Sequence, residues 1–311
     1  MENKNIFYLD CPAFDEPLRE IIPHEYGKIT SAMANKNYAL PIDAGVIKVL
    51  DQPGVKTVMS EIVSWGIDFH FASVIEDSIP VSDHNFPEIN AIVKHCVQQL
   101  GINRPTVVVS QSTGLNAYTI GNDKEPYIVL GSVLVNILNK DQLTFVIGHE
   151  CGHIAMGHLI WSSAATILTN FAGSLPVIGN VFITFSNVAL NSWSRRSEIS
   201  ADRAGYLCCQ NLDQSKRALI QINSGFLSAD YIDIDDYIKN IKRFRNGAYS
   251  RRFSDFERSH PIIPKRIEAM DLFAKSELYY EILGLPVPSG SIGRDNLNQS
   301  VERIIKAMGR E

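Results

Sequence analysis

Residues 159–193 form a stretch of 35 positions that contains no Asp, Glu, Lys or Arg. Such a stretch is long enough to hold a membrane span, which needs about 20 mostly apolar residues. However, 12 of its positions are Ser, Thr or Asn, and a proline and a Gly-Asn pair interrupt its middle. Ser162, Thr166 and Thr169 recur at spacings of three and four, which places them on one helical face. We therefore expect a helical hairpin that buries one face against protein, and membrane contact is the alternative.

The overall composition is that of a globular chain. Of 311 residues, 45% are hydrophobic and 20% are charged, which excludes a disordered or fibrous protein. The net charge of −5 lacks the basic excess of a nucleic-acid binder, so we expect no nucleic-acid partner. Five cysteines without a C-x-x-C spacing indicate neither a disulfide framework nor a cysteine zinc site. The N-terminal residues do not show the pattern of an export signal. We therefore expect a cytoplasmic protein, with peripheral membrane association as the alternative. The sequence does not determine the oligomeric state.

The pattern of apolar residues and turns predicts a helix-rich chain with one small sheet. Apolar residues at helical spacing predict two helices within 42–74 and a third over 86–100. A short apolar run at 105–110 predicts a strand, and the segments 115–120 and 126–130 flank a turn and predict a β-hairpin. Beyond this sheet the pattern is helical almost to the end. The predicted fold class is α+β and mostly helical.

The segment Ile147-Gly-His-Glu-Cys-Gly-His-Ile154 contains the spacing H-E-x-x-H. On a helix, His149 and His153 lie one turn apart on one face, and Glu150 lies within about 100° of both. Two neutral imidazoles suit Zn²⁺, and a carboxylate beside a water on that metal makes a hydrolytic site. The motif therefore predicts a zinc site with Glu150 as its general base.

A hydrolytic zinc site of this kind needs a third protein ligand. The metzincin pattern would place a glycine and then a histidine soon after the motif, but this chain has Met156 and Leu159 at those positions. Further along, Glu198 and Asp202 lie four residues apart, on one face of a predicted helix. They offer a ligand carboxylate and a second carboxylate that bonds the outer N–H of a ligand histidine.

Several motifs in order resemble one peptidase family. Three segments carry the resemblance: H-E-C-G-H-I-x-x-G-H from His149, S-E-I-S-A-D-R-A-G from Ser197, and Ser-His-Pro at 259–261 with Arg266-Ile267. With them the chain resembles the gluzincin peptidases related to the CAAX prenyl proteases and the HtpX-type heat-shock proteases. Asn116-Ala-Tyr118 resembles the family's edge-strand segment. The resemblance covers roughly residues 85–275, and the first 85 residues do not resemble the membrane helices of the prenyl proteases. A soluble bacterial-type relative is therefore favoured.

The resemblance implies a zincin-like fold and the activity of a zinc-dependent metalloendopeptidase that binds one zinc ion and cleaves peptide or protein substrates. In such a fold the edge strand of a small mixed sheet packs beside the zinc-binding helix. The resemblance implies that His149, His153 and Glu198 are the zinc ligands and that Glu150 is the catalytic base. It implies that Asp202 is the partner of a ligand histidine and that His260 is a candidate oxyanion donor. It also implies that Asn116, Ala117 and Tyr118 form the strand that pairs with an extended substrate.

The same resemblance divides the chain into three parts. Residues 1–84 form an N-terminal helical region that is a candidate cover of the cleft. Residues 85–275 form the peptidase core, with the hairpin 159–193 as an insert, and residues 276–311 form a C-terminal helical tail. Two other hypotheses stay open: a latent zinc scaffold acting as a chaperone-like binding module, and a membrane-surface protease that uses the hairpin.

His158 follows the motif closely but was not expected to be a ligand. If the helix continued beyond His153, His158 would lie about 140° around it from that residue. We therefore interpret His158 as a structural histidine.

Overall fold

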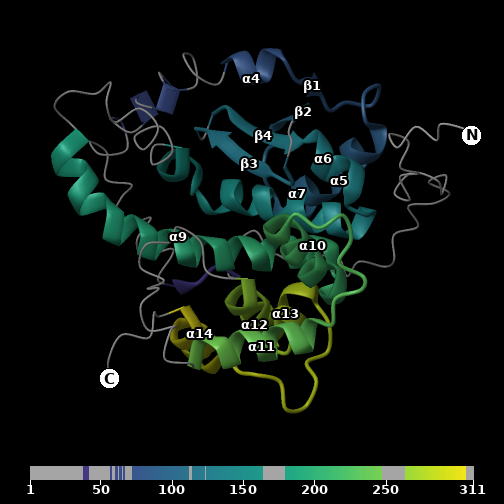
Figure 1. Ribbon diagram of the computed structural model, residues 1–311, viewed down its shortest axis with the longest axis vertical. Coiled ribbons are helices and arrows are strands. Elements are labelled where there is room, and N and C mark those ends of the chain that lie inside the picture. Colours follow the sequence, from purple (N-terminus) through teal and green to yellow (C-terminus); the bar gives the residue numbers. More distant parts are fainter. Residues whose placement is uncertain are drawn as a thin grey trace, which may run out of the picture.

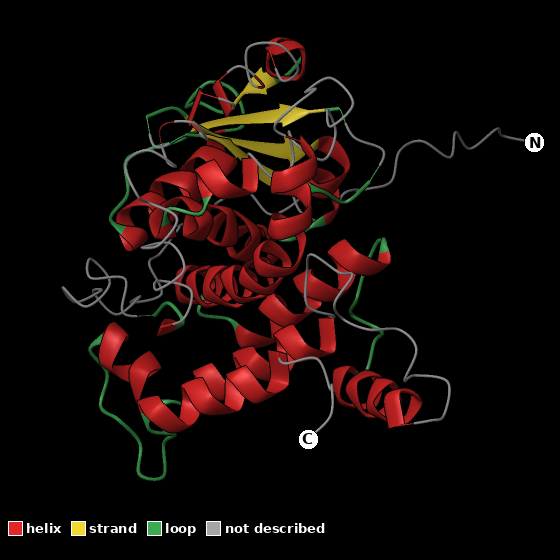
Figure 2. Ribbon diagram, turned by 90° about the vertical axis from the view of Figure 1, so that its left-hand side faces the viewer, coloured by secondary structure: helices red, strands yellow, loops and turns green. Residues whose placement is uncertain are grey.

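The computed structural model describes residues 72–111, 114–122, 124–163, 179–246 and 263–305, together with residues 38–41 and six positions between 57 and 66. The molecule is layered: the sheet lies on one side of helix α7 (Lys140–Met156), and helix α9 (Gly179–Cys209) packs along α7 on the side toward the C-terminal helices (Figures 1 and 2). The predicted fold class, mostly helical α+β with one small mixed sheet, is confirmed.

The sheet has four strands in the order β1-β2-β4-β3. The parallel pair β2 and β4 forms its centre, and the outer pairs are antiparallel. The strands are β1 (Ile79–Pro80), β2 (Thr106–Ser110), β3 (Ala117–Gly121) and β4 (Pro126–Gly131). The predicted hairpin is therefore present as β3 and β4. Its turn begins at Gly121, whose φ of 132° and missing side chain leave room for the carbonyl oxygen of Glu125.

Helix α5 (Pro87–Leu100) was predicted from its apolar spacing, and local signals set both of its ends. A proline occupies its first turn, and Gly101 ends it in the left-handed conformation with φ of 62°. Its buried face carries Ile89, Ile92, Val93, Cys96 and Leu100 and packs against α7.

Helix α7 (Lys140–Met156) carries the H-E-x-x-H motif through the centre of the molecule. A reciprocal capping box starts it, because the side chain of Asn139 accepts from the Gln142 N–H and the Gln142 side chain accepts from the Asn139 N–H. The short helix α6 (Ser132–Ile137) connects it to the sheet.

Two glycines of α7 allow helix α9 (Gly179–Cys209) to approach closely. A Cβ atom on Gly152 would lie 2.7 Å from the Cβ of Ala204, and one on Gly148 would lie 2.8 Å from the Cβ of Cys208. These distances are shorter than side chains tolerate, so only glycine permits this helix spacing. The close approach brings the acidic residues of α9 to the histidines of α7.

Helix α9 begins inside the uncharged stretch and continues without a break through Glu198. Residues 159–163, at the other end of the stretch, are also helical. The turn of the predicted hairpin falls at 164–178, outside the described residues. Within the part of the chain that the structure describes, no helix combines the length and apolarity needed to cross a membrane.

The C-terminal helices include α10 (Leu212–Ser224), which contacts both α7 and α9, together with α11 (Ile234–Asn246), α12 (Ile263–Ala274), α13 (Glu277–Leu283) and α14 (Arg294–Ile305). Helix α12 contacts α9 directly. Arg196 of α9 donates to both carboxylate oxygens of Glu302 on α14, at 3.0 and 2.8 Å, which joins α14 to the helix that carries Glu198.

The predicted N-terminal helices within 42–74 lie mostly outside the described residues, and only α4 (Ala72–Glu76) is described as a complete helix there. Two nearby N-terminal residues pack on α9. Arg203 donates to the Tyr38 carbonyl at 2.9 Å, and the Leu40 N–H donates to the Ser200 hydroxyl at 3.1 Å. Whether residues 1–84 cover the cleft stays a prediction, as do the proposed domain boundaries.

Candidate metal centre

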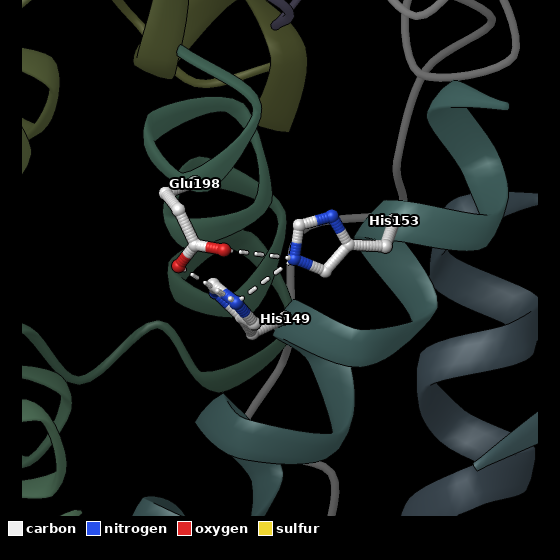
Figure 3. A group of neighbouring side chains, drawn as sticks. All are labelled: His149, His153 and Glu198. Atoms are coloured by element: carbon white, nitrogen blue, oxygen red, sulfur yellow. Dashed lines mark hydrogen bonds and ion pairs between the residues drawn. The ribbon is translucent and has the colours of Figure 1, made fainter. Parts of the chain in front are cut away.

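Three ligand-type side chains converge between α7 and α9, as Figure 3 shows. His149 and His153 come from successive turns of α7, and Glu198 comes from α9. The two Nε2 atoms are 3.2 Å apart, and the Glu198 carboxylate oxygens lie 3.6 Å from the Nε2 of His149 and 3.5 Å from that of His153. Ligand atoms around a tetrahedral zinc ion are about 3.3 Å apart, given metal–ligand distances of about 2.0–2.1 Å. The three residues therefore fit zinc.

The two Nε2 atoms and the Glu198 carboxylate oxygens are also of the kind that binds a cation. The Nδ1 atoms of both histidines have outer partners: Asp202 Oδ1 lies 3.1 Å from His149, and the Nδ1 of His158 lies 3.0 Å from His153. With protons on Nδ1, both Nε2 atoms turn their lone pairs toward each other and toward the Glu198 carboxylate. A divalent cation among them would satisfy all three acceptors at once.

Asp202 is buried, with 2% of its surface exposed, and it is held by Arg266 of α12. The Nε of Arg266 donates to Oδ2 at 2.8 Å, and its second terminal nitrogen donates to Oδ1 at 2.6 Å. Burial by itself would raise the pKa of Asp202, but the charge and hydrogen bonds of Arg266, with the hydrogen bond of His149, lower it. Asp202 is therefore a carboxylate that fixes the ring of His149.

Arg266 also contacts Glu198, at 3.0 Å from Oε2. Burial alone would lower the pKa of this guanidinium, but the carboxylates of Asp202 and Glu198 raise it. One arginine thus neutralises part of the charge of two buried acids. With Glu150 included, these four groups carry a net charge of −2, which matches a divalent cation. The sequence motif contained Arg266, but nothing in its spacing predicted this contact.

Glu150 is buried on α7 and bonds to the edge strand β3. The Thr119 hydroxyl donates to Oε2 of Glu150, and it lies 3.4 Å from the carbonyl oxygen of the same residue. This hydrogen bond fixes one carboxylate oxygen and leaves Oε1 to accept another proton donor. Thr119 was not predicted as a site residue, although it directly follows the predicted segment Asn116–Tyr118.

Strand β3 is the edge of the sheet, and its register shows which residues face outward. The Gly131 N–H donates to the Asn116 carbonyl at 2.9 Å, so Asn116 bonds to β4. Because main-chain groups alternate along a strand, Ala117 and Thr119 direct theirs away from β4. Gly121 faces the same way, and its N–H donates to the Ser163 hydroxyl at 3.1 Å. The outward edge beside Glu150 therefore runs from Ala117 to Gly121, where the Ser163 hydroxyl accepts from the Gly121 N–H.

His158 and His260 are the two remaining histidines that were considered in the sequence analysis. His158 does not lie 140° around a continuing helix, because α7 ends at Met156 and the chain turns at Gly157, which brings the His158 ring to His153. His260 lies outside the described residues, so its role as an oxyanion donor stays a prediction.

The model of peptidase family M48 matches residues 83–273, which is well over half of the chain. The chain belongs to peptidase family M48. This confirms the resemblance seen in the sequence. The matched range includes the edge strand, both histidines of the motif, Glu198 and Arg266.

Curated relatives of this M48 chain carry metallopeptidase names. Plastoglobule-localized metallopeptidase 48, chloroplastic, from Arabidopsis thaliana is 28% identical over 217 residues, which cover 67% of this chain and 63% of the relative. A protease HtpX homolog from Thermoplasma volcanium is 26% identical over 253 residues, covering 70% of this chain and 81% of the relative. The chain thus spans less than two thirds of the length of the Arabidopsis protein.

A solved structure overlaps loosely with the fold. The crystal structure of S. mikatae Ste24p shares 19% sequence identity and a TM-score of 0.42, with coverage of 77% of this chain and 63% of that one. The overlap is too loose to carry an argument about the M48 chain described here.

Proposed function

We propose that this M48 chain is a zinc-dependent metalloendopeptidase that hydrolyses peptide bonds, with Glu150 as its general base. One observation carries the proposal: Glu150 lies on the same helix as two converging histidines and bonds to a sheet edge that an extended peptide can join. A zinc scaffold without catalysis would need the ligands but not a buried carboxylate held beside them.

His149, His153 and Glu198 would hold the zinc ion. When bound, zinc supplies a Lewis acid that polarises the scissile carbonyl and makes a water molecule more acidic. Asp202 and Arg266 keep the ring of His149 in the orientation that directs its Nε2 toward the metal.

Glu150 moves the proton in this proposal. Thr119 holds its Oε2, and Oε1 accepts a proton from the attacking water and then returns it to the leaving amine. Because the same side chain accepts and donates, Glu150 must stay close to both the water and the scissile bond. Its attachment to β3 supports this, since the substrate would lie along the same strand.

An extended peptide would bind by main-chain hydrogen bonds to Ala117 and Thr119, whose N–H and C=O groups face away from β4. Such binding reads the extended backbone more than the side chains. We therefore propose unfolded or extended protein segments as the substrate class. We place the activity in the cytoplasm, and the four described cysteines, which are all free thiols, support a reducing compartment.

The test compares the zinc-loaded parent with Glu150→Gln, using an internally quenched peptide library and zinc analysis of the same samples. The variant keeps the size and the hydrogen bond of the side chain but removes the base. We expect equal zinc contents and a loss of cleavage in the variant. Equal cleavage rates for the parent and Glu150→Gln would contradict the mechanism.

A further inference from the structure

We infer that His158 is a positioning residue for the zinc ligand His153: it accepts a hydrogen bond from the Nδ1–H of His153 and thereby directs the Nε2 of that ring toward the metal. The inference rests on the proposed function, because it takes His149, His153 and Glu198 as the zinc ligands. The sequence alone identified no residue that would orient the ring of His153, and the inference supplies one.

The end of helix α7 brings the two histidines together. Gly157 has a left-handed backbone with φ of 73°, and its N–H lies 3.1 Å from the carbonyl oxygen of Ile154. The His158 N–H donates to the carbonyl of His153 at 3.0 Å. These two bonds form a Schellman motif, in which the second residue after the helix folds back over the last turn. His158 is therefore held against His153 by the backbone.

The side chains make the functional contact. The Nδ1 atoms of His153 and His158 are 3.0 Å apart, so one donates and the other accepts. A histidine that binds zinc through Nε2 must carry its proton on Nδ1. His153 is then the donor and His158 the acceptor. His158 must accordingly be the neutral tautomer that carries its proton on Nε2.

Packing fixes the ring of His158 in this place. The residue is fully buried, and its ring meets that of Trp193 edge to face, with centroids 5.3 Å apart and an interplanar angle of 88°. Its carbonyl accepts from the Ser162 N–H at 2.9 Å. Trp193 lies on α9, the helix that carries Glu198, so both helices of the metal site constrain the acceptor.

The two ligand histidines are therefore held differently. His149 donates to the carboxylate of Asp202, whereas His153 donates to a neutral imidazole. Hydrogen bonds to a charged acceptor are stronger than those to a neutral one. His158 consequently fixes the orientation of His153 while polarising it less than Asp202 polarises His149.

The first test measures zinc affinity by competition with a chromophoric chelator. His158→Phe keeps a ring but removes the acceptor, and we expect about 10–100-fold weaker zinc binding, the usual cost of losing an outer partner of a ligand. His158→Asn places an oxygen near the position of Nδ1 and should restore most of the affinity. His95→Phe is the matched control, because His95 bonds the Cys208 carbonyl and no ligand; its affinity should equal that of the parent.

The second test needs no substitution and uses ¹⁵N histidine spectra of the zinc-loaded parent. We expect His153 to be protonated on Nδ1 and His158 on Nε2. A parent-like zinc affinity in a folded His158→Phe, or a His158 protonated on Nδ1, would overturn the inference while leaving the zinc site intact. A parent that binds no zinc at His149, His153 and Glu198 would overturn the inference together with the proposed function.

Discussion

Arg266 of α12 donates two buried hydrogen bonds, of 2.8 and 2.6 Å, to the carboxylate of Asp202 on α9. The pair joins segments 64 residues apart. Because Asp202 in turn orients His149, the C-terminal helices take part in the metal site without supplying a ligand.

Arg266→Gln should destabilise the metal-free protein by about 3–5 kcal/mol, because it leaves two buried carboxylates without their counter-charge. Urea unfolding of the metal-free chain measures this loss. Arg266→Lys keeps the charge but not the two-pronged geometry, so we expect an intermediate stability. A Gln variant as stable as the parent would show that the ion pair does not support the fold.

Gly152→Ala should weaken both stability and zinc binding. The added Cβ would lie 2.7 Å from that of Ala204, so α7 and α9 must separate and Glu198 must move from the histidines. We expect a loss of about 1–3 kcal/mol, the usual cost of overpacking, measured by thermal unfolding with and without zinc. Gly293→Ala is the matched control, because its nearest neighbour would be 3.7 Å away, and it should behave like the parent.

Thr119→Val should reduce turnover without changing zinc content. It removes the hydroxyl that holds Oε2 of Glu150, and one hydrogen bond to a charged group is worth about 1.5–3 kcal/mol. We expect kcat to fall by on the order of 10-fold or more, measured with a quenched peptide. Thr119→Ser keeps the hydroxyl and should retain most of the activity. Unchanged kcat in the valine variant would remove Thr119 from the mechanism.

Three buried thiols should resist alkylation at pH values where unfolded thiols react. Burial raises the pKa of Cys209 to about 12, and it also raises the pKa of Cys96 and Cys151. Iodoacetamide reacts with the thiolate, so at any pH between about 7 and 9 the native thiols should react far more slowly than unfolded thiols with a pKa of about 8.5. Peptide mass spectrometry of native and urea-treated samples follows each site. A native rate equal to the unfolded rate at the same pH would contradict the burial of these thiols.

Local signals made much of the fold predictable. Helix α5 has apolar spacing and a closing glycine, and the hairpin has a polar turn between two apolar strands. The strand β1 was missed because Ile79–Pro80 is too short to show any periodicity. The N-terminal cover and the role of His260 stay predictions, because they fall largely or wholly outside the described residues.

The site was predictable where its residues share a helix. The spacing of His149 and His153 on α7 indicates their common face. Glu198 needed the resemblance, and the contacts of Thr119 and Arg266 depend on pairings 31 and 64 residues apart that no local pattern encodes. The contact of His158 with His153 was not predicted, because the helical wheel was extended past Gly157. A glycine and then a histidine directly after a ligand-bearing turn is the signal that points to this contact.

We propose that His149, His153 and Glu198 together bind one zinc ion. Elemental analysis of the purified parent and of Glu198→Ala, each dialysed against buffered zinc, tests it most directly. We expect one zinc per chain in the parent and almost none in a folded Glu198→Ala, whose metal site keeps only two ligands. An equal zinc content in the two proteins would contradict it.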